Sequence, residues 1–169
     1  MNQAAIYAGT FDPVTFGHLD VIRRAARIFP RLIVAVADNA SPTSKSTLLP
    51  VDERVAIARE AVSGIPGVEV EPFSGLLVEY VRSRGIRVII RGLRAFSDFE
   101  FEFQMALTNR SLAPDIETLF LMPKQDFSYV SSSTVRQIAE LGGDVSGFVP
   151  PASREALRRR LKESSGSRP

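Results

Sequence analysis

The segment GTFDPVTFGH, residues 9–18, combines residue types that can bind a phosphate group and act on it. It follows an apolar run and enters a stretch of helical period, so His18 falls in the first turn of a predicted helix, with the hydroxyl of Thr10 nearby. Gly9 and Gly17 permit backbone angles and close approaches that bulkier residues resist. Because the amides at a helix start attract anions, the pattern indicates a phosphate site. The alternative is a tight turn with a capping threonine and a surface histidine.

Two arginines form a second candidate phosphate site. The run RVII, residues 87–90, predicts a buried strand, and Arg91 emerges directly after it. Arg94 lies on the same predicted loop, beyond Gly92, whose lack of a side chain leaves room for a ligand. Guanidinium groups are permanently charged and bind phosphate oxygens in a bidentate manner, which favours a phosphate role for both arginines. They could instead pair with acidic residues nearby, namely Asp98, Glu100 and Glu102.

Three successive serines, Ser131 to Ser133, stand at the start of a predicted helix within residues 127–143. Serine at a helix start ordinarily caps the helix, and capping is the first explanation for them. Capping does not need three serines, however, so their hydroxyls and the helix amides could also bind a polyphosphate. Arg136, in the first turns of this helix, could assist or be solvated.

These segments must be positioned by the elements around them. Short apolar runs alternate with segments of helical period, which predicts an α/β fold of parallel βαβ units with right-handed crossovers. We expect a single-domain, Rossmann-like, doubly wound parallel sheet of five strands, with its ligand crevice beyond the carboxyl ends of the strands. Lys45 is a weaker candidate in the long polar loop 38–50, which we expect to move. The predicted strands are residues 4–8, 32–37, 68–73, 87–90 and 117–122, and the predicted helices include residues 18–29, 52–62 and 76–84.

The stretch 96–112 is predicted to be a helix with two apolar stripes. Two apolar faces on one helix suggest that one packs on the sheet and the other on a partner chain. The alternative is a helix buried within the monomer. One stripe contains Phe96, Phe99, Phe103 and Leu107, and the other contains Phe101, Met105 and Leu112.

Composition excludes several classes of protein. The 169 residues suffice for one domain, and the absence of cysteine together with a single histidine excludes disulfides, iron–sulfur clusters and multi-histidine metal cages. No apolar run approaches the ~20 residues of a membrane span, and the first residues lack the pattern of a signal peptide, so we expect a cytoplasmic protein that does not bind membranes.

The net charge is only +2, and its positive excess lies in residues 154–169, which argues against nucleic acid as a partner. We expect residues 1–163 to form the domain and residues 164–169 a flexible tail.

The order and spacing of the motifs resemble a known superfamily. Residues 15–18, Thr-Phe-Gly-His, fill the T/HxGH signature, so the chain resembles the nucleotidyltransferases, which share their fold with class I aminoacyl-tRNA synthetases. The segments SKSTLLPVDER, IIRGLRAFSDFEFE, NRSL, FLMP and SSSTVR narrow the resemblance to the branch that transfers adenylate from ATP to 4′-phosphopantetheine, giving dephospho-coenzyme A and pyrophosphate. Three positions depart from that pattern. Phe16 and Phe101 stand where asparagine and tyrosine are usual, and Ser46 stands where a second lysine is common.

The resemblance also implies residue roles and partners. The implied catalytic residues are His18, Thr10, Lys45 and Arg91, and the implied contacts to 4′-phosphopantetheine are Thr10, Lys45, Leu77 and Arg91. It further implies a homohexamer and coenzyme A as an inhibitor. We expect Mg²⁺ to accompany the triphosphate, keeping several waters and few protein ligands. The implied ATP contacts are Thr10, Phe11, His18, Gly92, Leu93, Arg94, Glu102, Phe127, Ser128, Tyr129, Val130, Ser131, Ser132 and Ser133.

The reaction is expected to be direct. No nucleophilic side chain with an adjacent base is evident, which indicates in-line attack of the acceptor phosphate on the α-phosphorus of ATP, without a covalent intermediate. Two alternatives stay open. One is another small-molecule nucleotidyltransferase, acting with CTP or on nicotinamide mononucleotide, and the other is a non-catalytic module that binds nucleotide or RNA.

Overall fold

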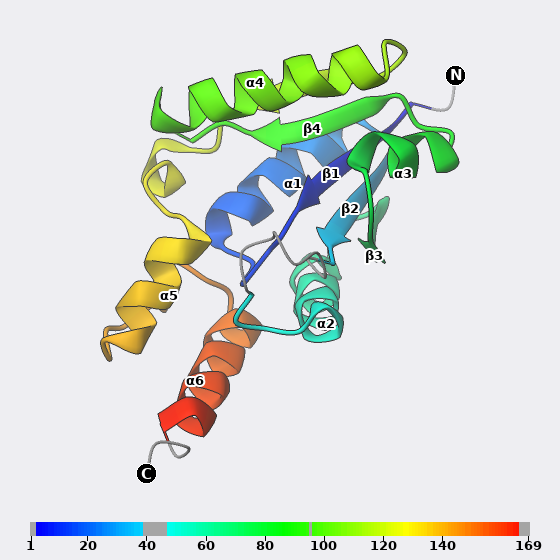
Figure 1. Ribbon diagram of the computed structural model, residues 1–169. Coiled ribbons are helices and arrows are strands. Elements are labelled where there is room, and N and C mark those ends of the chain that lie inside the picture. Colours follow the sequence, from blue (N-terminus) through cyan, green and yellow to red (C-terminus); the bar gives the residue numbers. More distant parts are fainter. Residues whose placement is uncertain (1–2, 39–46, 95, 166–169) are drawn as a thin grey trace.

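A five-stranded parallel sheet forms the centre of the computed structural model, which describes residues 3–38, 47–94 and 96–165 (Figure 1). The strand order is β3-β2-β1-β4-β5, and every neighbouring pair is parallel. The chain first adds β2 and β3 on one side of β1 and then crosses over to add β4 and β5 on the other side. The direction in which strands are added therefore reverses at β1. The strands are β1 (Ala4–Gly9), β2 (Arg31–Ala37), β3 (Val68–Phe73), β4 (Val88–Gly92) and β5 (Glu117–Leu121).

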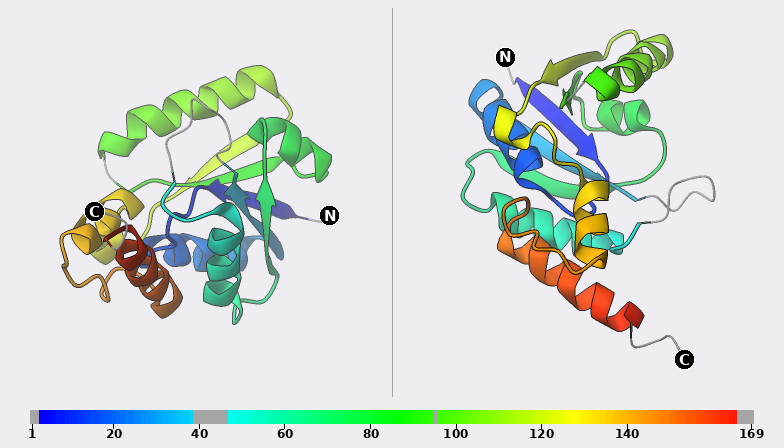
Figure 2. Two further views of the ribbon diagram at one scale, coloured as in Figure 1. Left: turned by 60° about the horizontal axis from the view of Figure 1, so that its bottom comes forward. Right: turned by 90° about the vertical axis from the view of Figure 1, so that its left-hand side faces the viewer.

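Helices cover both faces of the sheet, so the predicted doubly wound α/β fold is confirmed (Figures 1 and 2). One face packs against α1 and α2, and the other packs against α3. In the described parts of the chain, no helix is both long enough and apolar enough to span a membrane. The helices are α1 (Phe16–Ile28), α2 (Val51–Val62), α3 (Leu77–Ser83), α4 (Phe96–Leu112), α5 (Ser132–Glu140) and α6 (Pro151–Ser165), with one 3-10 turn, η1 (Gln125–Phe127).

Two neighbouring strands of the sheet, β1 and β2, are buried on both faces. Tyr7 of β1 points to the core shared with α1 and α2, whereas its neighbours Ile6 and Ala8 point to the core shared with α3. This alternation follows from the two-residue period of a strand. Each fully buried Val, Leu or Ile side chain stabilises the fold by about 1.5–3 kcal/mol, so β1 and β2 form a rigid base for the residues at their carboxyl ends.

The two C-terminal helices form a smaller core of their own beside the sheet. Val135 of α5 and Leu157 of α6 pack in a cluster with Val130, Val145 and Val149. The buried Ser153 hydroxyl of α6 donates to the carbonyl of Val14 at 2.8 Å, which ties α6 to the segment before α1. Helix α6 runs to Ser165, two residues beyond the predicted domain boundary at residue 163.

Helix α4 differs from the sequence-based expectation. Residues of both predicted stripes are exposed in the single chain: Phe99 and Phe103 on one stripe, Phe101 and Met105 on the other. The expectation that one stripe packs on the sheet is therefore wrong, and so is the alternative of burial within the monomer. The apolar residues of the helix lie on two separate sides, with polar residues between them, and a helix of this kind is stable when both apolar sides are covered. Among the α4 side chains that the structure describes, the buried ones are polar, Glu102 and Asn109.

Candidate functional site

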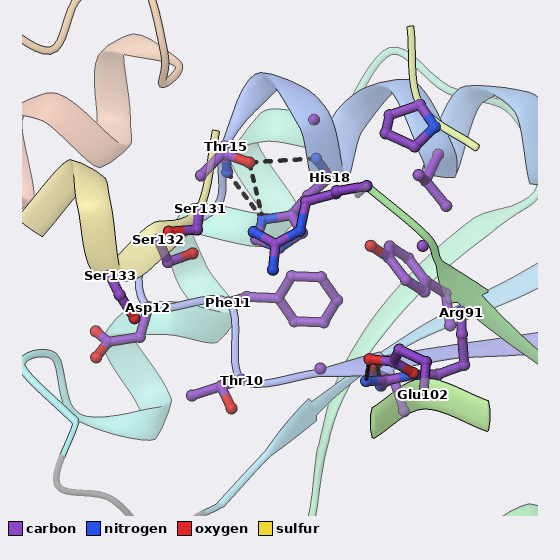
Figure 3. A pocket seen from close by; sticks show the side chains of 18 of the residues that line it. Thr10, Phe11, Asp12, Thr15, His18, Arg91, Glu102, Ser131, Ser132 and Ser133 are labelled. Atoms are coloured by element: carbon purple, nitrogen blue, oxygen red, sulfur yellow. Dashed lines mark hydrogen bonds and ion pairs between the residues drawn. The ribbon is translucent and has the colours of Figure 1, made fainter. Parts of the chain in front are cut away.

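A cavity of about 260 Å³ opens at the carboxyl ends of β1 and β4, where the strand order reverses (Figure 3). Open parallel sheets bind their ligands at this kind of position. Its walls come from the turn after β1, the first turn of α1, the end of β4 and the start of α5. Arg91 and Gly92 belong to β4 itself and not to the loop after it, which corrects the predicted strand end at residue 90. The predicted residues that line the cavity are Thr10, Phe11, His18, Arg91, Gly92, Arg94, Glu102, Ser131, Ser132 and Ser133.

The imidazole of His18 is held by the start of its own helix. Thr15 is the N-cap residue of α1, and its hydroxyl accepts a hydrogen bond from the His18 backbone N–H at 3.3 Å. In return, the Thr15 backbone N–H donates to Nδ1 of His18 at 3.0 Å. This is a capping box in which histidine takes the place of the usual glutamate or glutamine. Because Nδ1 accepts, the neutral ring carries its proton on Nε2.

The electrostatic surroundings keep the His18 ring neutral. Burial, together with the positive charges of Arg94 and Arg91, lowers the pKa of His18 to about 3. At neutral pH the ring is therefore an uncharged hydrogen-bond donor through Nε2. It offers a directed N–H and no positive charge of its own.

Phe11 fixes the other side of the imidazole. Its buried ring makes edge-to-face contacts with both His18 and Tyr7, with centroid distances of 5.0 and 5.3 Å. The Phe11 backbone has φ = 49°, in the left-handed region that side chains other than glycine seldom adopt. The packing of the ring holds this conformation, which directs the turn after β1 along the cavity.

Arg91 lies between two acceptors at the cavity edge. Its Nε and Nη2 donate to the Glu102 carboxylate at 2.7 and 2.6 Å, and its Nη1 donates to the carbonyl of Ala8 at 2.7 Å. Burial opposes the charge on Arg91, but the hydrogen bond and negative charge of Glu102 outweigh it and raise its pKa. Three of the five guanidinium N–H groups are engaged, so two donors are left for a ligand.

Arg94 is also paired with an acid. Its Nε donates to Asp98 at 3.0 Å, and its Nη1 donates to the carbonyl of Val130 at 3.1 Å. The alternative stated for both arginines, pairing with nearby carboxylates, is thus confirmed. Both nevertheless line the cavity, and phosphate binding by them stays a prediction.

The three serines have three different partners. Ser131 caps α5, accepting from the Thr134 N–H at 3.0 Å. The Ser132 hydroxyl donates to the carbonyl of Pro13 at 2.8 Å, which ties the start of α5 to the turn after β1. Ser133 contacts the guanidinium of Arg136 at 3.4 Å. Capping accounts for one serine, and the N-terminus of α5 faces the cavity with all three beside it (Figure 3).

Some predicted site residues do not line the cavity. Lys45 lies outside the described residues. Leu77 begins α3 and packs against the core on the far face of the sheet. Leu93, Phe127, Ser128, Tyr129 and Val130 are likewise absent from the cavity wall, and their predicted ATP contacts stay predictions.

Asp12 and Tyr7 line the cavity but were not predicted as site residues, and neither was Arg54, which contacts the lining residue Thr10 from outside the cavity wall. Buried Asp12 accepts from the N–H groups of Leu48 and Leu49, at 2.8 and 3.0 Å. Burial raises the pKa of Tyr7 to about 12, against the opposing charges of Arg91 and Arg94, so its hydroxyl stays protonated beside the cavity. The buried charge of Arg54, in an otherwise apolar row of α2, was the signal available in the sequence.

The described residues contain no group of three or more acidic or histidine side chains placed to hold a metal ion. The two buried carboxylates on the cavity wall are already engaged, Glu102 by Arg91 and Asp12 by backbone N–H groups. A divalent cation at this site would therefore be held chiefly by a phosphate ligand and water.

Comparisons with known proteins agree with this geometry. Residues 6–138 match the model of the family described as Cytidylyltransferase-like. A phosphopantetheine adenylyltransferase of Methylococcus capsulatus is 56% identical over 164 residues, which cover 97% of this chain and 99% of that protein. Another, from Alkalilimnicola ehrlichii, is 57% identical over 160 residues, covering 95% and 91%.

A solved structure shares the fold. It is described as a putative nicotinate-nucleotide adenylyltransferase from Vibrio parahaemolyticus, and it superposes with a TM-score of 0.71 over 95% of both chains. The sequence identity is 18%, so this likeness bears on the fold alone.

Proposed function

This chain belongs to the cytidylyltransferase-like family, and from that membership and its site we propose that it reversibly transfers adenylate from ATP to 4′-phosphopantetheine. The products are dephospho-coenzyme A and pyrophosphate, a step of coenzyme A biosynthesis. One observation carries the proposal: relatives described as phosphopantetheine adenylyltransferases are 56% and 57% identical to this chain over nearly its whole length.

The chemistry is a single in-line displacement. An oxygen of the acceptor phosphate forms a bond to the α-phosphorus of ATP, and the bond from that phosphorus to the bridging oxygen of pyrophosphate breaks. The electron pair leaves with pyrophosphate, so no side chain has to form a covalent intermediate. Holding both substrates in line can supply about 7–11 kcal/mol of the barrier, and charge stabilisation supplies the rest.

His18 is the proposed hydrogen-bond donor to the transition state. The Thr15 N–H occupies Nδ1, so Nε2–H is free to donate to a non-bridging α-phosphate oxygen as negative charge builds on it. A neutral donor with a fixed tautomer suits this role, because it needs no proton uptake before reaction. Thr10, directly after β1, is proposed to orient the attacking phosphate.

The cations of the site are proposed to offset the repulsion between two anionic substrates. Arg91 has two guanidinium donors left for the acceptor phosphate, with Lys45 assisting. Arg94 and the serines at the start of α5 are proposed to hold the leaving pyrophosphate. We propose Leu77 as a further contact to 4′-phosphopantetheine, and Phe11, Gly92, Leu93, Glu102 and residues 127–133 as the remaining ATP contacts.

Mg²⁺ is proposed to enter with the triphosphate. The engaged carboxylates of the cavity fit an ion that the phosphates and water hold, and the ion would neutralise part of the triphosphate charge. The residues nearest to such a complex would be Arg94 and the serines of α5, which bind the phosphate oxygens themselves.

The proposal extends to assembly, regulation and location. The exposed apolar residues of α4 support association with further copies of the chain, and the family resemblance points to a homohexamer in the cytoplasm. Coenzyme A contains the phosphopantetheine group of the substrate, so we propose that it competes for the acceptor site as an inhibitor.

A turnover assay tests the function. Pyrophosphate release from ATP should require 4′-phosphopantetheine, and dephospho-coenzyme A should form in equal amount. Neither CTP in place of ATP nor nicotinamide mononucleotide in place of 4′-phosphopantetheine should support release. Release with either substitute, or none with the proposed pair, would contradict the proposal.

A further inference from the structure

Arg54 of α2 is a buried arginine next to the site. It is 1% exposed, and its guanidinium donates to three backbone carbonyls. The acceptors are Leu49 at 2.9 Å, Thr10 at 2.7 Å and Ala37 at 2.8 Å. Among the residues that the structure describes, no carboxylate lies within ion-pair distance of it.

A buried cation of this kind opposes folding. Burial lowers the pKa of Arg54, although Asp12 and Asp38 oppose that effect, and a guanidinium stays charged at neutral pH. An apolar side chain of similar volume would fill the space without the cost of removing a charge from water. The arginine is therefore better explained by the geometry that its donors impose than by packing.

The three carbonyls belong to three different segments. Thr10 follows β1, Ala37 ends β2, and Leu49 lies just before α2. From the opposite side, Asp12 accepts from the N–H of Leu49 at 3.0 Å, so the Leu49 residue is held through both its N–H and its carbonyl. Arg54 and Asp12 together fasten the turn that carries Thr10 to the start of α2.

We propose that Arg54 is a positioning residue for Thr10. By holding the Thr10 carbonyl at 2.7 Å, it fixes where the Thr10 side chain meets the cavity and hence the incoming acceptor phosphate. This inference rests on the proposed adenylyl transfer for its assay. A displacement of about 1 Å in a positioning group can lower a rate on the order of a hundredfold.

The variants Arg54→Lys and Arg54→Met test the role. Lysine keeps the charge but cannot reach three carbonyls that lie in three directions, and methionine keeps only the volume. Both should lower kcat by about tenfold or more, while the KM for ATP changes by less than about threefold. If Arg54→Met fails to fold, the kcat of Arg54→Lys alone tests the positioning role. A lysine variant with the kcat of the unmodified protein would overturn the inference.

Arg59→Met is the matched control. Arg59 lies on the same helix and also donates to a backbone carbonyl, that of Val70 at 3.2 Å, but Val70, unlike Thr10, does not line the cavity. Its replacement should leave kcat within about twofold. An equal loss of kcat in Arg59→Met would show that loosening α2 suffices, and the positioning role would be wrong.

A double-mutant cycle with Thr10→Ala separates positioning from general structure. If Arg54 acts through Thr10, the change Arg54→Lys should lower kcat by less than about twofold in the Thr10→Ala background. Fully additive losses would contradict the inference.

The unmodified protein serves as the reference for these assays. If it releases no pyrophosphate from ATP and 4′-phosphopantetheine, the proposed function fails, and thermal unfolding then tests whether the contacts of Arg54 hold the three segments together. In that case Arg54→Lys should still unfold at a lower temperature than Arg59→Met, and the reverse order would refute its contacts.

Discussion

The backbone N–H of Thr15 donates to Nδ1 of His18 at 3.0 Å, and this one contact decides which nitrogen of the ring can face a substrate. The same two residues close the capping box at the start of α1. Helix initiation and the orientation of the proposed donor are therefore one structural feature. The tautomer is set before any substrate binds, which is the preorganisation that charge stabilisation requires.

The substitution His18→Ala tests the donor role. Because the proposed hydrogen bond strengthens as charge develops, we expect kcat to fall by about 10²- to 10³-fold, the usual cost of removing one such donor. Binding of ATP, measured by calorimetry, should change much less. Equal losses in kcat and in ATP affinity would contradict a role specific to the transition state.

The pH dependence of His18 provides a second test. The unfolded chain binds a proton on this histidine near pH 6.5, whereas the folded chain does so only near pH 3. The unfolded state thus binds more protons between these values, so the free energy of unfolding should decrease as pH falls from about 6.5 toward about 3 and be insensitive to this group above that range. Urea unfolding should therefore show that the unmodified protein loses stability relative to His18→Gln as pH falls from about 6.5 toward about 3, whereas the difference between the two proteins stays constant above that range. A difference that does not change with pH would contradict this pKa.

His18 is the single histidine of the chain, so its ring signals in NMR spectra need no assignment. They should report the Nε2–H tautomer at neutral pH and show no titration between about pH 8 and 5. An inflection near pH 6.5 would mean that the ring is neither buried nor held as described.

The pair of Arg91 and Glu102 provides a third test. Glu102→Gln keeps the side-chain volume but removes the charge that Arg91 contacts at 2.6 Å. We expect stability to fall by about 1–3 kcal/mol, because a largely buried guanidinium loses its charged partner. The KM for 4′-phosphopantetheine should rise, since Arg91 is no longer fixed.

Glu117→Gln is the control for that change. Glu117 pairs with Arg110 at 2.8 Å, but both side chains are more than half exposed. Its loss should alter stability by no more than about 1 kcal/mol. If the two glutamine variants behave alike in urea unfolding and in kinetics, the Arg91–Glu102 pair has no special role in the site.

The apolar surface of α4 provides a fourth test. Phe101 and Met105 are 61% and 40% exposed and lie one turn apart. Charges at both positions, Phe101→Glu with Met105→Glu, should dissociate the proposed hexamer, as measured by light scattering, while the circular dichroism spectrum is retained. Leu141→Glu is the control, because Leu141 is exposed at the end of α5 and away from α4. A monomeric unmodified protein, or an unchanged mass in the double variant, would contradict the assembly proposal.

Much of the fold followed from sequence periodicity. All five strands were predicted, and so were helices in the places of α1 to α5. The strands could be recognised because parallel strands buried on both faces read as short continuous apolar runs. The histidine, the arginines and the serines were predicted to share one edge of the sheet, since each follows a strand, and the cavity wall contains all of them.

Contacts between distant backbone segments could not be predicted. Asp12 binds N–H groups of residues 48 and 49, and Arg54 binds the carbonyl of Thr10, across 36 to 44 residues of chain. Backbone acceptors carry no sequence signal, so the place of Arg54 among apolar residues of α2 could indicate that it is buried but not which carbonyls it binds. The surroundings of α4 were mispredicted for a related reason. Apolar stripes indicate that a helix face packs against other apolar residues, but they do not show whether those residues belong to the same chain.

A crystal structure with bound ATP tests the central claim most directly. The account predicts that Nε2 of His18 lies about 2.7–3.2 Å from a non-bridging oxygen of the α-phosphate, with the triphosphate over the start of α5. A triphosphate bound elsewhere, or a ring turned so that Nε2 faces away from it, would contradict the account.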